Sequence, residues 1–425
     1  MNSNPSSPKL TSKAPLTAQV AQWRSYFPAL EQKVHGHPLV YLDNAATSLK
    51  PHSVIEEITR YYSTINANVH RANHSLGHAS TEVYEAARSR IANFIGAKDV
   101  SSIVFTKGTT DSLNFLADTL GTSFLKPGDA VLLTESEHHS NMVPWIELIA
   151  KRGIQLVYLP VDRSGHLDME AYVDLLDSRS DIRLLTIAHS SNLTGAVHPL
   201  KEMITKAKAK GISVLVDGAQ GVVHQSVNVT GLGCDFYAFS GHKLYGPMGI
   251  GVLYIHPKWF ATLPPYQYGG GMISEVQFDR VTFAEEPYKY EAGTPNVAGA
   301  AGLKAAIEFL DDEIDLSAAW EHEQHLYKRL LHGVEQIEGV SVLGGGDRAQ
   351  DPIVSFYVEG VHHYDLATML DGLGVAVRAG HHCVQPLLRK WGLKGTVRAS
   401  LAFYNTEAEV DYFLQSLERV LGMLQ

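Results

Sequence analysis

The chain has 425 residues and a mass of 46.6 kDa, which is more than one hydrophobic core usually holds, so two domains are expected. Hydrophobic residues make up 45% of it and charged residues 19%, which excludes a largely disordered or fibrous chain. The net charge of −10 disfavours binding to nucleic acid or to an anionic membrane. No apolar run approaches the roughly 18 residues of a membrane span, and two cysteines cannot make a disulfide framework. A cytoplasmic location is therefore expected.

Short apolar runs alternate with helical patterns through most of the chain. Four of these runs, at Ala130–Thr134, Gln155–Leu159, Leu184–Ala188 and Ser213–Asp217, are rich in valine, leucine and isoleucine. Such runs are typical of strands buried on both faces of a mainly parallel sheet. The alternation with helices predicts an α/β layered domain.

The pattern of predicted strands and helices changes after residue 310. A long amphipathic helix, four strands and a closing helix are expected there: Leu316–Ile337, Val340–Leu343, Ile353–Tyr357, Val375–Arg378, Val397–Leu401 and the stretch after Thr406. Thr406 and Glu409 have the spacing of a capping box at the start of the closing helix.

These patterns divide the chain into three expected parts. Residues 1–19, rich in serine and proline, are expected to be a flexible tail, without the apolar core of a secretory signal or the arginines of a transit peptide. Residues 20–310 are expected to form a large domain, whose opening residues are free to pack on the smaller one. Residues 311–425 are expected to form that smaller α+β domain.

The first residues that indicate a chemical function are an aspartate at the end of a predicted strand and a lysine. Asp217 ends an apolar run, and Lys243 follows in the segment Ser240-Gly241-His242-Lys243. Open α/β sheets bind ligands beyond such strand ends. Enzymes that use pyridoxal phosphate (PLP) need a lysine for the Schiff base and an anion beside the pyridine nitrogen. Each residue alone is more commonly a turn residue or a solvated side chain, but together with the following segments they indicate a PLP site.

A phosphate seat is predicted upstream. Gly108-Thr109-Thr110 follows a predicted strand and precedes a helix expected to open at Asp111 or Ser112. Free amides and threonine hydroxyls at a helix N-terminus suit a dianion, whereas capping alone would explain one threonine. The chain contains neither GxGxxG nor GxxxxGK[ST], so nicotinamide and P-loop interpretations have little support.

A flat cofactor also needs a stacking partner. His138 follows the run Ala130–Thr134 and lies at the carboxyl edge of the predicted sheet. An imidazole there can stack on the ring and move protons near neutral pH. A helix-capping loop explains the same segment equally well.

The two cysteines have different surroundings. Cys234 precedes an apolar segment and is expected to be a small buried filler. Cys383 lies in a Gly/His loop between Arg378 and Arg398, where positive charge favours a thiolate. Because arginine binds carboxylates bidentately, Arg398 is the favoured substrate anchor and Arg378 a shared substrate or loop contact. A zinc interpretation of this loop lacks a second ligand cluster, so no metal is predicted.

These segments together resemble a known family. The chain is similar to the type II (SufS/CsdA-like) cysteine desulfurases, a family that also shows selenocysteine lyase activity, within the class V aminotransferase superfamily. Met248 and Lys107 depart from the pattern and touch no expected catalytic role. The matching segments run in this order: YLDNAATSLKP, NVHRANHSLGHAS, FTKGTTDSLN, EHHSNMVPW, SNLTG, VDGAQG, FSGHKLYGP, YEAGTPN, RAGHHCVQP and VRASLAFYNT.

The resemblance implies a fold, an activity and partners. The fold is PLP-dependent transferase fold type I, with a large mainly parallel-sheet domain, a smaller C-terminal α+β domain and a homodimeric assembly. The activity is conversion of L-cysteine to L-alanine with an enzyme-bound persulfide, and L-selenocysteine is a further expected substrate. The sulfur would go to a SufE-like acceptor protein for iron–sulfur cluster assembly or another sulfur transfer.

The resemblance also implies roles for individual residues. Lys243 would form the Schiff base, Asp217 would pair with the pyridinium, Gln220 would bond the ring hydroxyl, and His138 would stack on the ring. The phosphate would be held by Thr109, Thr110, Ser240 and His242, with Thr294 from the other subunit. Asn192 would lie beside cofactor and substrate, Cys383 would accept sulfur, and Arg398 with Arg378 would bind the substrate carboxylate.

Two alternatives remain open at the level of sequence. A class V aminotransferase or another PLP lyase would make Cys383 incidental and would require a keto acid for amino transfer. A non-catalytic PLP-fold scaffold for sulfur transfer would not need Lys243, Asp217 and Cys383 together.

Overall fold

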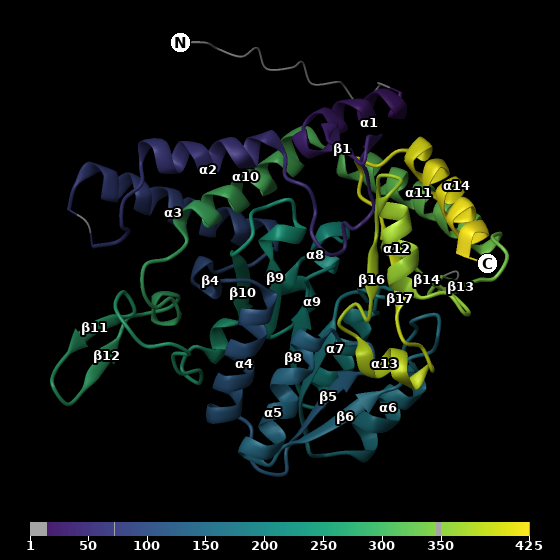
Figure 1. Cartoon of the computed structure of the whole chain (residues 1–425). Helices are drawn as coiled ribbons and strands as arrows, with labels where there is room; N and C mark the ends of the chain where they lie inside the picture. Colours follow the sequence, from purple (N-terminus) through teal and green to yellow (C-terminus); the bar gives the residue numbers. More distant parts are fainter. Residues whose placement is uncertain (1–14, 72, 346–349, 425) are drawn as a thin grey trace.

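The computed structural model describes residues 15–71, 73–345 and 350–424. Within these residues the largest sheet has seven strands in the order β4-β10-β9-β8-β7-β5-β6 (Figure 1). All neighbouring pairs from β9 to β6 are parallel, whereas β10 runs antiparallel to both β4 and β9. The predicted mainly parallel α/β sheet is therefore confirmed. The strands are β4 (Ile103–Thr106), β5 (Ala130–Thr134), β6 (Gln155–Leu159), β7 (Ile182–Ala188), β8 (Ser213–Asp217), β9 (Phe236–Ser240) and β10 (Gly251–Ile255).

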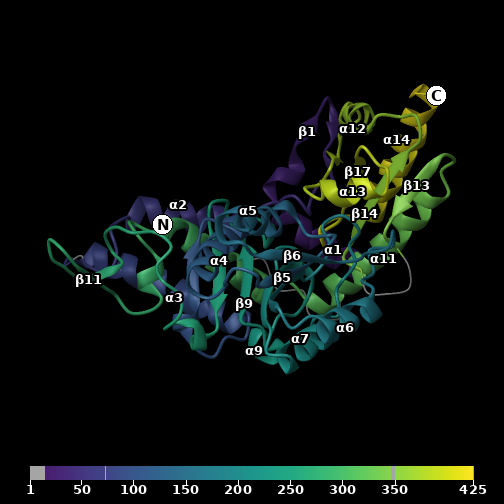
Figure 2. The same cartoon turned by 90° about the horizontal axis from the view of Figure 1, so that it is seen from below.

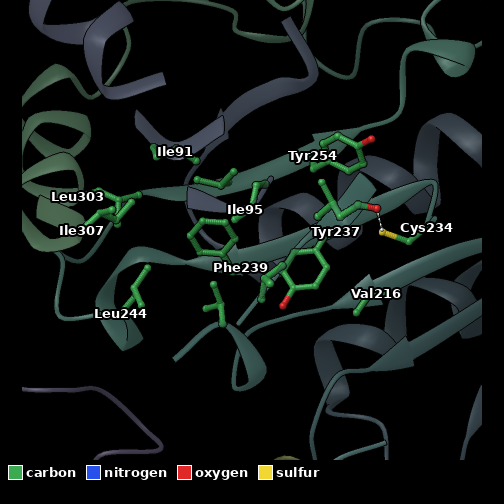
Figure 3. Close-up of a cluster of buried hydrophobic side chains, with 14 of the residues drawn as sticks. Ile91, Ile95, Val216, Cys234, Tyr237, Phe239, Leu244, Tyr254, Leu303 and Ile307 are labelled. Atoms are coloured by element: carbon green, nitrogen blue, oxygen red, sulfur yellow. Dashed lines mark hydrogen bonds between the residues drawn. The ribbon is translucent and has the colours of Figure 1, made fainter. Parts of the chain in front are cut away.

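Successive side chains along a strand point to opposite faces of this sheet, and helices pack against both faces. Val216, Tyr237 and Phe239 face one core, where they meet Ile91 and Leu303 from helices (Figure 3). That core is covered by α3 (Ser75–Phe94), α6 (Met169–Ser178), α7 (Leu200–Ala209) and α10 (Val297–Glu313). The other face packs on α4 (Thr109–Ser123) and α5 (Val143–Arg152). Burial on both faces explains why the strands are apolar throughout.

A second sheet belongs to the C-terminal part. Its four strands are antiparallel in the order β13-β14-β17-β16, and three helices share its core. Figures 1 and 2 both show this sheet with its helices beside the main sheet. The elements are β13 (Val340–Leu343), β14 (Ile353–Val358), β16 (Arg378–Gly380), β17 (Thr396–Ser400), α11 (Leu316–Glu335), α12 (His363–Asp371) and α14 (Glu407–Leu424).

One predicted strand of this part was wrong. The expected strand Val375–Arg378 is divided between two sheets, because β15 (Val375–Ala376) pairs in parallel with β3 (Val40–Tyr41). After Val377 the chain changes partner and β16 pairs with β17. Tertiary pairing with an N-terminal segment therefore overrides the local apolar pattern.

The N-terminal segment connects the two sheets. Residues 1–14 of the expected tail lie outside the described residues, and α1 (Leu16–Ser25) begins within the rest of it. Trp23 of α1 packs on Phe403 with ring centroids 5.9 Å apart. Val40 and Leu42 lie in the core of the C-terminal sheet. The expected boundary after residue 310 stays a prediction, and α10 continues across it to Glu313.

Several further elements complete the description. Among the described residues, no helix combines the length and the hydropathy needed to span a bilayer. The remaining helices and strands are α2 (His52–Thr64), α8 (Gly221–His224), α9 (Val229–Leu232), α13 (Gln385–Lys390), β1 (Lys33–Val34), β2 (His37–Pro38), β11 (Ile273–Val276) and β12 (Val281–Phe283).

The capping box predicted for the last helix is formed. The Glu409 N–H donates to Thr406 Oγ1 at 3.2 Å, and the Thr406 N–H donates to Glu409 Oε2 at 2.9 Å. We expect Thr406→Ala to lower the free energy of unfolding by about 1 kcal/mol, because a helix N–H loses its acceptor. Chemical denaturation measures this change. Glu418→Ala, at an exposed position of the same helix, is the control, and an equal loss in both variants would contradict the role of the cap.

Candidate active site

A cavity of about 190 Å3 lies where the carboxyl ends of the main strands meet the C-terminal sheet. Twelve of the thirteen predicted site residues line it, and they come from the ends of five main-sheet strands or the segments after them, from β16 and the loop after it, and from β17. Lys243 and Cys383 therefore open onto one space. The lining residues from the prediction are Thr109, Thr110, His138, Asn192, Asp217, Gln220, Ser240, His242, Lys243, Arg378, Cys383 and Arg398.

Thr294 is the predicted residue that the structure does not bring to this cavity. It lines a separate cavity of about 310 Å3 with Tyr84, Gly249 and Asn296. Its expected role was in the cavity of a second subunit, so that role stays a prediction.

Lys243 and Asp217 are placed by adjacent strands. Asp217 ends β8 and is 5% exposed, and Lys243 ends the short turn that follows β9. Burial lowers the pKa of Lys243 to about 8, although the charge of Asp217 opposes the shift. Burial raises the pKa of Asp217, whereas the Ala219 N–H, 3.0 Å from Oδ1, favours the ionised form. The amine is therefore closer to its neutral, nucleophilic form than an exposed lysine would be.

Sequence reasoning missed how the peptide before Lys243 is held. The His242 carbonyl accepts hydrogen bonds from Lys50 Nζ at 2.6 Å, Thr47 Oγ1 at 3.0 Å and Ser48 Oγ at 3.1 Å. Burial lowers the pKa of Lys50 to about 7. These donors come from the segment YLDNAATSLKP, which the sequence showed only as a family motif. They fix the main chain at the base of the Lys243 side chain.

The segment predicted as a phosphate seat lies at a helix N-terminus, with one correction to where the helix begins. Helix α4 begins at Thr109 rather than at Asp111 or Ser112, because Gly108 adopts φ 153° as its N-cap. Both threonines therefore lie in the first turn of α4. A Cβ on Gly251 would lie 2.4 Å from the Gly108 Cα, so glycine is required where β10 passes this turn.

The polar groups at this seat fit a dianionic group. The Ser240 hydroxyl lies 2.8 Å from both the N–H and the Oγ1 of Thr109, and Thr110 Oγ1 lies 2.7 Å from Ser140 Oγ. Nδ1 of His242 is buried and has no partner among the described residues. Hydroxyls, an orphan ring nitrogen and a helix N-terminus are the groups that bind a phosphate. The residues present therefore fit PLP.

His138 and Gln220 line the cavity where a flat ring would lie. The Ser140 N–H donates to His138 Nδ1 at 3.0 Å, which leaves Nε2 as the protonated nitrogen of the neutral ring. Burial lowers the pKa of His138 to about 3, and the charge of Lys243 adds to the effect. Gln220 donates through Nε2 to the Ala45 carbonyl at 2.8 Å, which fixes its amide beside Asp217.

The two arginines share one carboxylate that sequence reasoning missed. They face each other across β16 and β17, where Arg398 is 2% exposed and Arg378 has 46% of its side chain exposed. Asp43 lies 3.4 Å from Arg398 Nη2 and 3.8 Å from Arg378 Nη1. Arg398 also donates to the Asn192 carbonyl at 2.8 Å, and its buried Nε has no partner in the parts of the chain that the structure describes. Burial lowers the pKa of the Arg398 guanidinium to about 10. An unpaired buried donor suits a substrate carboxylate.

The cysteines lie as predicted. Cys234 is 1% exposed in the core below the main sheet, and burial raises the pKa of its thiol to about 12 (Figure 3). Cys383 is half-buried at the cavity, between β16 and α13. No group of three or more metal-binding side chains occurs within the described parts of the chain.

The neutral state of His138 leads to a pH prediction. The unfolded chain binds a proton at this position near pH 6.5, whereas the folded chain does so only near pH 3. His138 therefore makes the free energy of unfolding fall as the pH falls from 6.5 towards 3. We expect His138→Gln to make this fall shallower in urea unfolding at several pH values. His332→Gln, at an exposed position, is the control, and identical slopes for His138→Gln and wild type would contradict the prediction.

Comparisons with known proteins show the family to which the chain belongs. Residues 40–413 match the family model described as Aminotransferase class-V. A probable cysteine desulfurase of Vibrio cholerae is 44% identical over 401 residues, which cover 94% of this chain and 98% of that protein. The crystal structure of the Escherichia coli cysteine desulfurase CsdA superposes with a TM-score of 0.87 at 41% identity, covering 96% of this chain and 99% of the other. That of the Thermococcus onnurineus desulfurase gives 0.87 at 40% identity, covering 93% and 98%. The chain thus belongs to the class-V aminotransferase family and, within it, to the type II cysteine desulfurases.

Proposed function

We propose that the protein is a PLP-dependent enzyme that converts L-cysteine to L-alanine and retains the sulfur on Cys383 as a persulfide. One observation carries the proposal: Lys243, Asp217 and Cys383 open onto the same cavity. An aminotransferase has no need of a thiol there. PLP supplies an electron sink that stabilises negative charge at the substrate Cα.

Each side chain of the cavity has its own proposed role. Lys243, with its lowered pKa, is suited to carry the cofactor and then to move the Cα proton. Asp217 would pair with the ring nitrogen, and His138 and Gln220 would orient the ring. The phosphate would be held by Thr109, Thr110, Ser240 and His242. Arg398, Arg378 and Asn192 would hold the substrate so that its sulfur faces Cys383.

The sulfur step balances without an added oxidant. The Cys383 thiolate attacks the substrate sulfur, so an S–S bond forms as the Cβ–S bond breaks. The electron pair of the broken bond stays on the carbon side, where protons complete L-alanine. The enzyme thiol and L-cysteine thus give the enzyme persulfide and L-alanine.

The first test removes the thiol. We expect Cys383→Ala to abolish alanine formation from L-cysteine while the absorbance of the Lys243-bound cofactor remains, because the nucleophile alone is lost. In the wild type, mass spectrometry after brief exposure to L-cysteine should find one added sulfur on the Cys383 peptide. Cys234→Ala is the matched control and should retain turnover, since Cys234 lies outside the cavity. Full turnover by Cys383→Ala would disprove the persulfide step.

The second test concerns the substrate carboxylate. We expect Arg398→Lys to raise the KM for L-cysteine by about ten- to a hundredfold, because lysine cannot replace a buried bidentate donor. Arg378→Lys should raise KM less, because Arg378 is half-exposed. Steady-state kinetics measure both changes. A larger increase for Arg378→Lys would show that the anchor has been assigned to the wrong arginine.

A homodimer is proposed as the working assembly. The hairpin of β11 and β12 stands away from the main sheet (Figure 1). Its apolar side chains Phe278, Val276 and Val281 are exposed, and exposed apolar groups of this kind mark contact sites. In a dimer, Thr294 would contribute to the phosphate seat of the second subunit, as the family resemblance implies.

The physiological setting is proposed from the resemblance alone. It supports a cytoplasmic enzyme that passes sulfur to a SufE-like acceptor for iron–sulfur cluster assembly or other sulfur transfer. It also supports selenocysteine lyase activity. Comparing turnover of L-cysteine and L-selenocysteine, each with and without an acceptor protein, tests these assignments.

A further inference from the structure

Cys383 lies in a turn that its own backbone does not favour. His382 has φ 48° and Cys383 has φ 58°, so two consecutive residues with side chains are in the left-handed region. This region is disfavoured for L-residues other than glycine. Such a conformation persists only where contacts from outside the turn hold it.

One residue of the main-sheet side, His139, makes contacts both at the cysteine and two residues after it. The His139 N–H donates to the Cys383 carbonyl at 2.7 Å. The ring of the same histidine accepts, through Nε2, a hydrogen bond from the Gln385 N–H at 3.1 Å. His139 begins the short turn after β5, so it is fixed by the main sheet. It therefore attaches the cysteine turn to the part of the chain that carries His138.

Two other contacts hold the residue before the cysteine. Asn192 Nδ2 donates to the His382 carbonyl at 2.6 Å, and His382 Nε2 lies 3.1 Å from the Thr396 carbonyl. Neither of these contacts reaches Cys383 or the helix that follows it. Among the described residues, His139 reaches Cys383 through its main-chain N–H and Gln385 through its ring, while the Val384 N–H closes the turn on the His381 carbonyl at 2.9 Å.

The ring of His139 can accept only when it is neutral. Gln385 is the first residue of α13, and its N–H has no acceptor inside that helix. Burial, followed by the charge of His381, lowers the pKa of His139, which favours the neutral ring. The N–H of Gln385 and the unprotonated Nε2 of His139 are therefore complementary at neutral pH.

We propose that His139 is a positioning residue for sulfur transfer: it holds the left-handed turn that keeps the Cys383 thiol at the cavity. The inference rests on the proposed function. It assigns His139 to the sulfur step alone, because the groups proposed to bind the substrate and to move the Cα proton are held by other contacts.

Two variants of the cofactor-loaded enzyme distinguish the effect of the hydrogen-bond acceptor from the effect of the ring's volume. His139→Phe keeps a ring but has no acceptor, whereas His139→Gln places an amide oxygen within reach of the Gln385 N–H. We expect His139→Phe to slow persulfide formation on Cys383 in a single turnover by about tenfold or more. His139→Gln should recover most of the rate. His381→Ala, an exposed neighbour in the same loop, is the control and should retain the wild-type rate.

A second readout distinguishes positioning from general damage. Exchange of the Cα hydrogen of L-alanine with deuterated water requires the substrate-binding and proton-moving groups but no thiol. It should change by no more than about twofold in His139→Phe. In the cofactor-free protein, amide exchange at Gln385 should speed up in His139→Phe and not in His139→Gln. If His139→Phe fails to bind the cofactor, the smaller His139→Leu provides the same comparison.

The outcomes are distinct. Equal loss of Cα exchange and persulfide formation, or a wild-type rate of persulfide formation in His139→Phe, would overturn the inference. A wild-type enzyme that forms no persulfide would instead overturn the proposed function, while the amide exchange at Gln385 would still report the contact with His139.

Discussion

The cavity concentrates buried positive charge, and the rest of the site depends on this constraint. Lys243, Arg398 and Arg378 meet there, opposed by the carboxylates Asp217 and Asp43. Burial lowers the pKa of the lysine to about 8 and that of Arg398 to about 10, because each cation loses hydration and faces the others. Anionic groups are therefore favoured at two places: a phosphate at α4 and a carboxylate at the arginines.

Neither sheet builds this site alone. The Arg398 side chain leaves the C-terminal sheet and donates to the Asn192 carbonyl, while the Asn192 amide donates back to the cysteine loop at His382. Asp43 reaches the same arginine from the N-terminal segment. Because each contact joins segments far apart in the chain, correct geometry at the site requires both cores to be formed. The positions of the binding side chains therefore depend on how the two sheets pack together.

What could be predicted from the sequence follows from local physics. Strands buried on both faces are apolar throughout, so β5 and β8 have the predicted bounds. The edge strand β6 also has its predicted bounds, although Gln155 and Tyr158 are exposed. The capping box at Thr406 is a contact between near neighbours and was equally visible. Twelve of the residues that line the cavity were found through motifs that combine such local signals with a family resemblance, whereas Ser140, Ser190 and His382 were not.

What could not be predicted depends on tertiary contacts. Asp43, Lys50 and His139 act on residues that lie at least 190 positions away along the chain, and no spacing rule connects such pairs. The split of Val375–Arg378 was hidden for the same reason, since its first half pairs with β3. The start of α4 depended on the backbone angle of Gly108, which composition does not reveal.

The close passage of Gly251 beside Gly108 has a practical consequence for engineering this scaffold. A mutagenesis library aimed at new amino-acid substrates would naturally vary the arginines and the neighbouring loops. Gly251 should be held constant in such a library, because a single methyl group there would displace the anion seat without touching the substrate. Loss of coenzyme retention would then be mistaken for a change in selectivity.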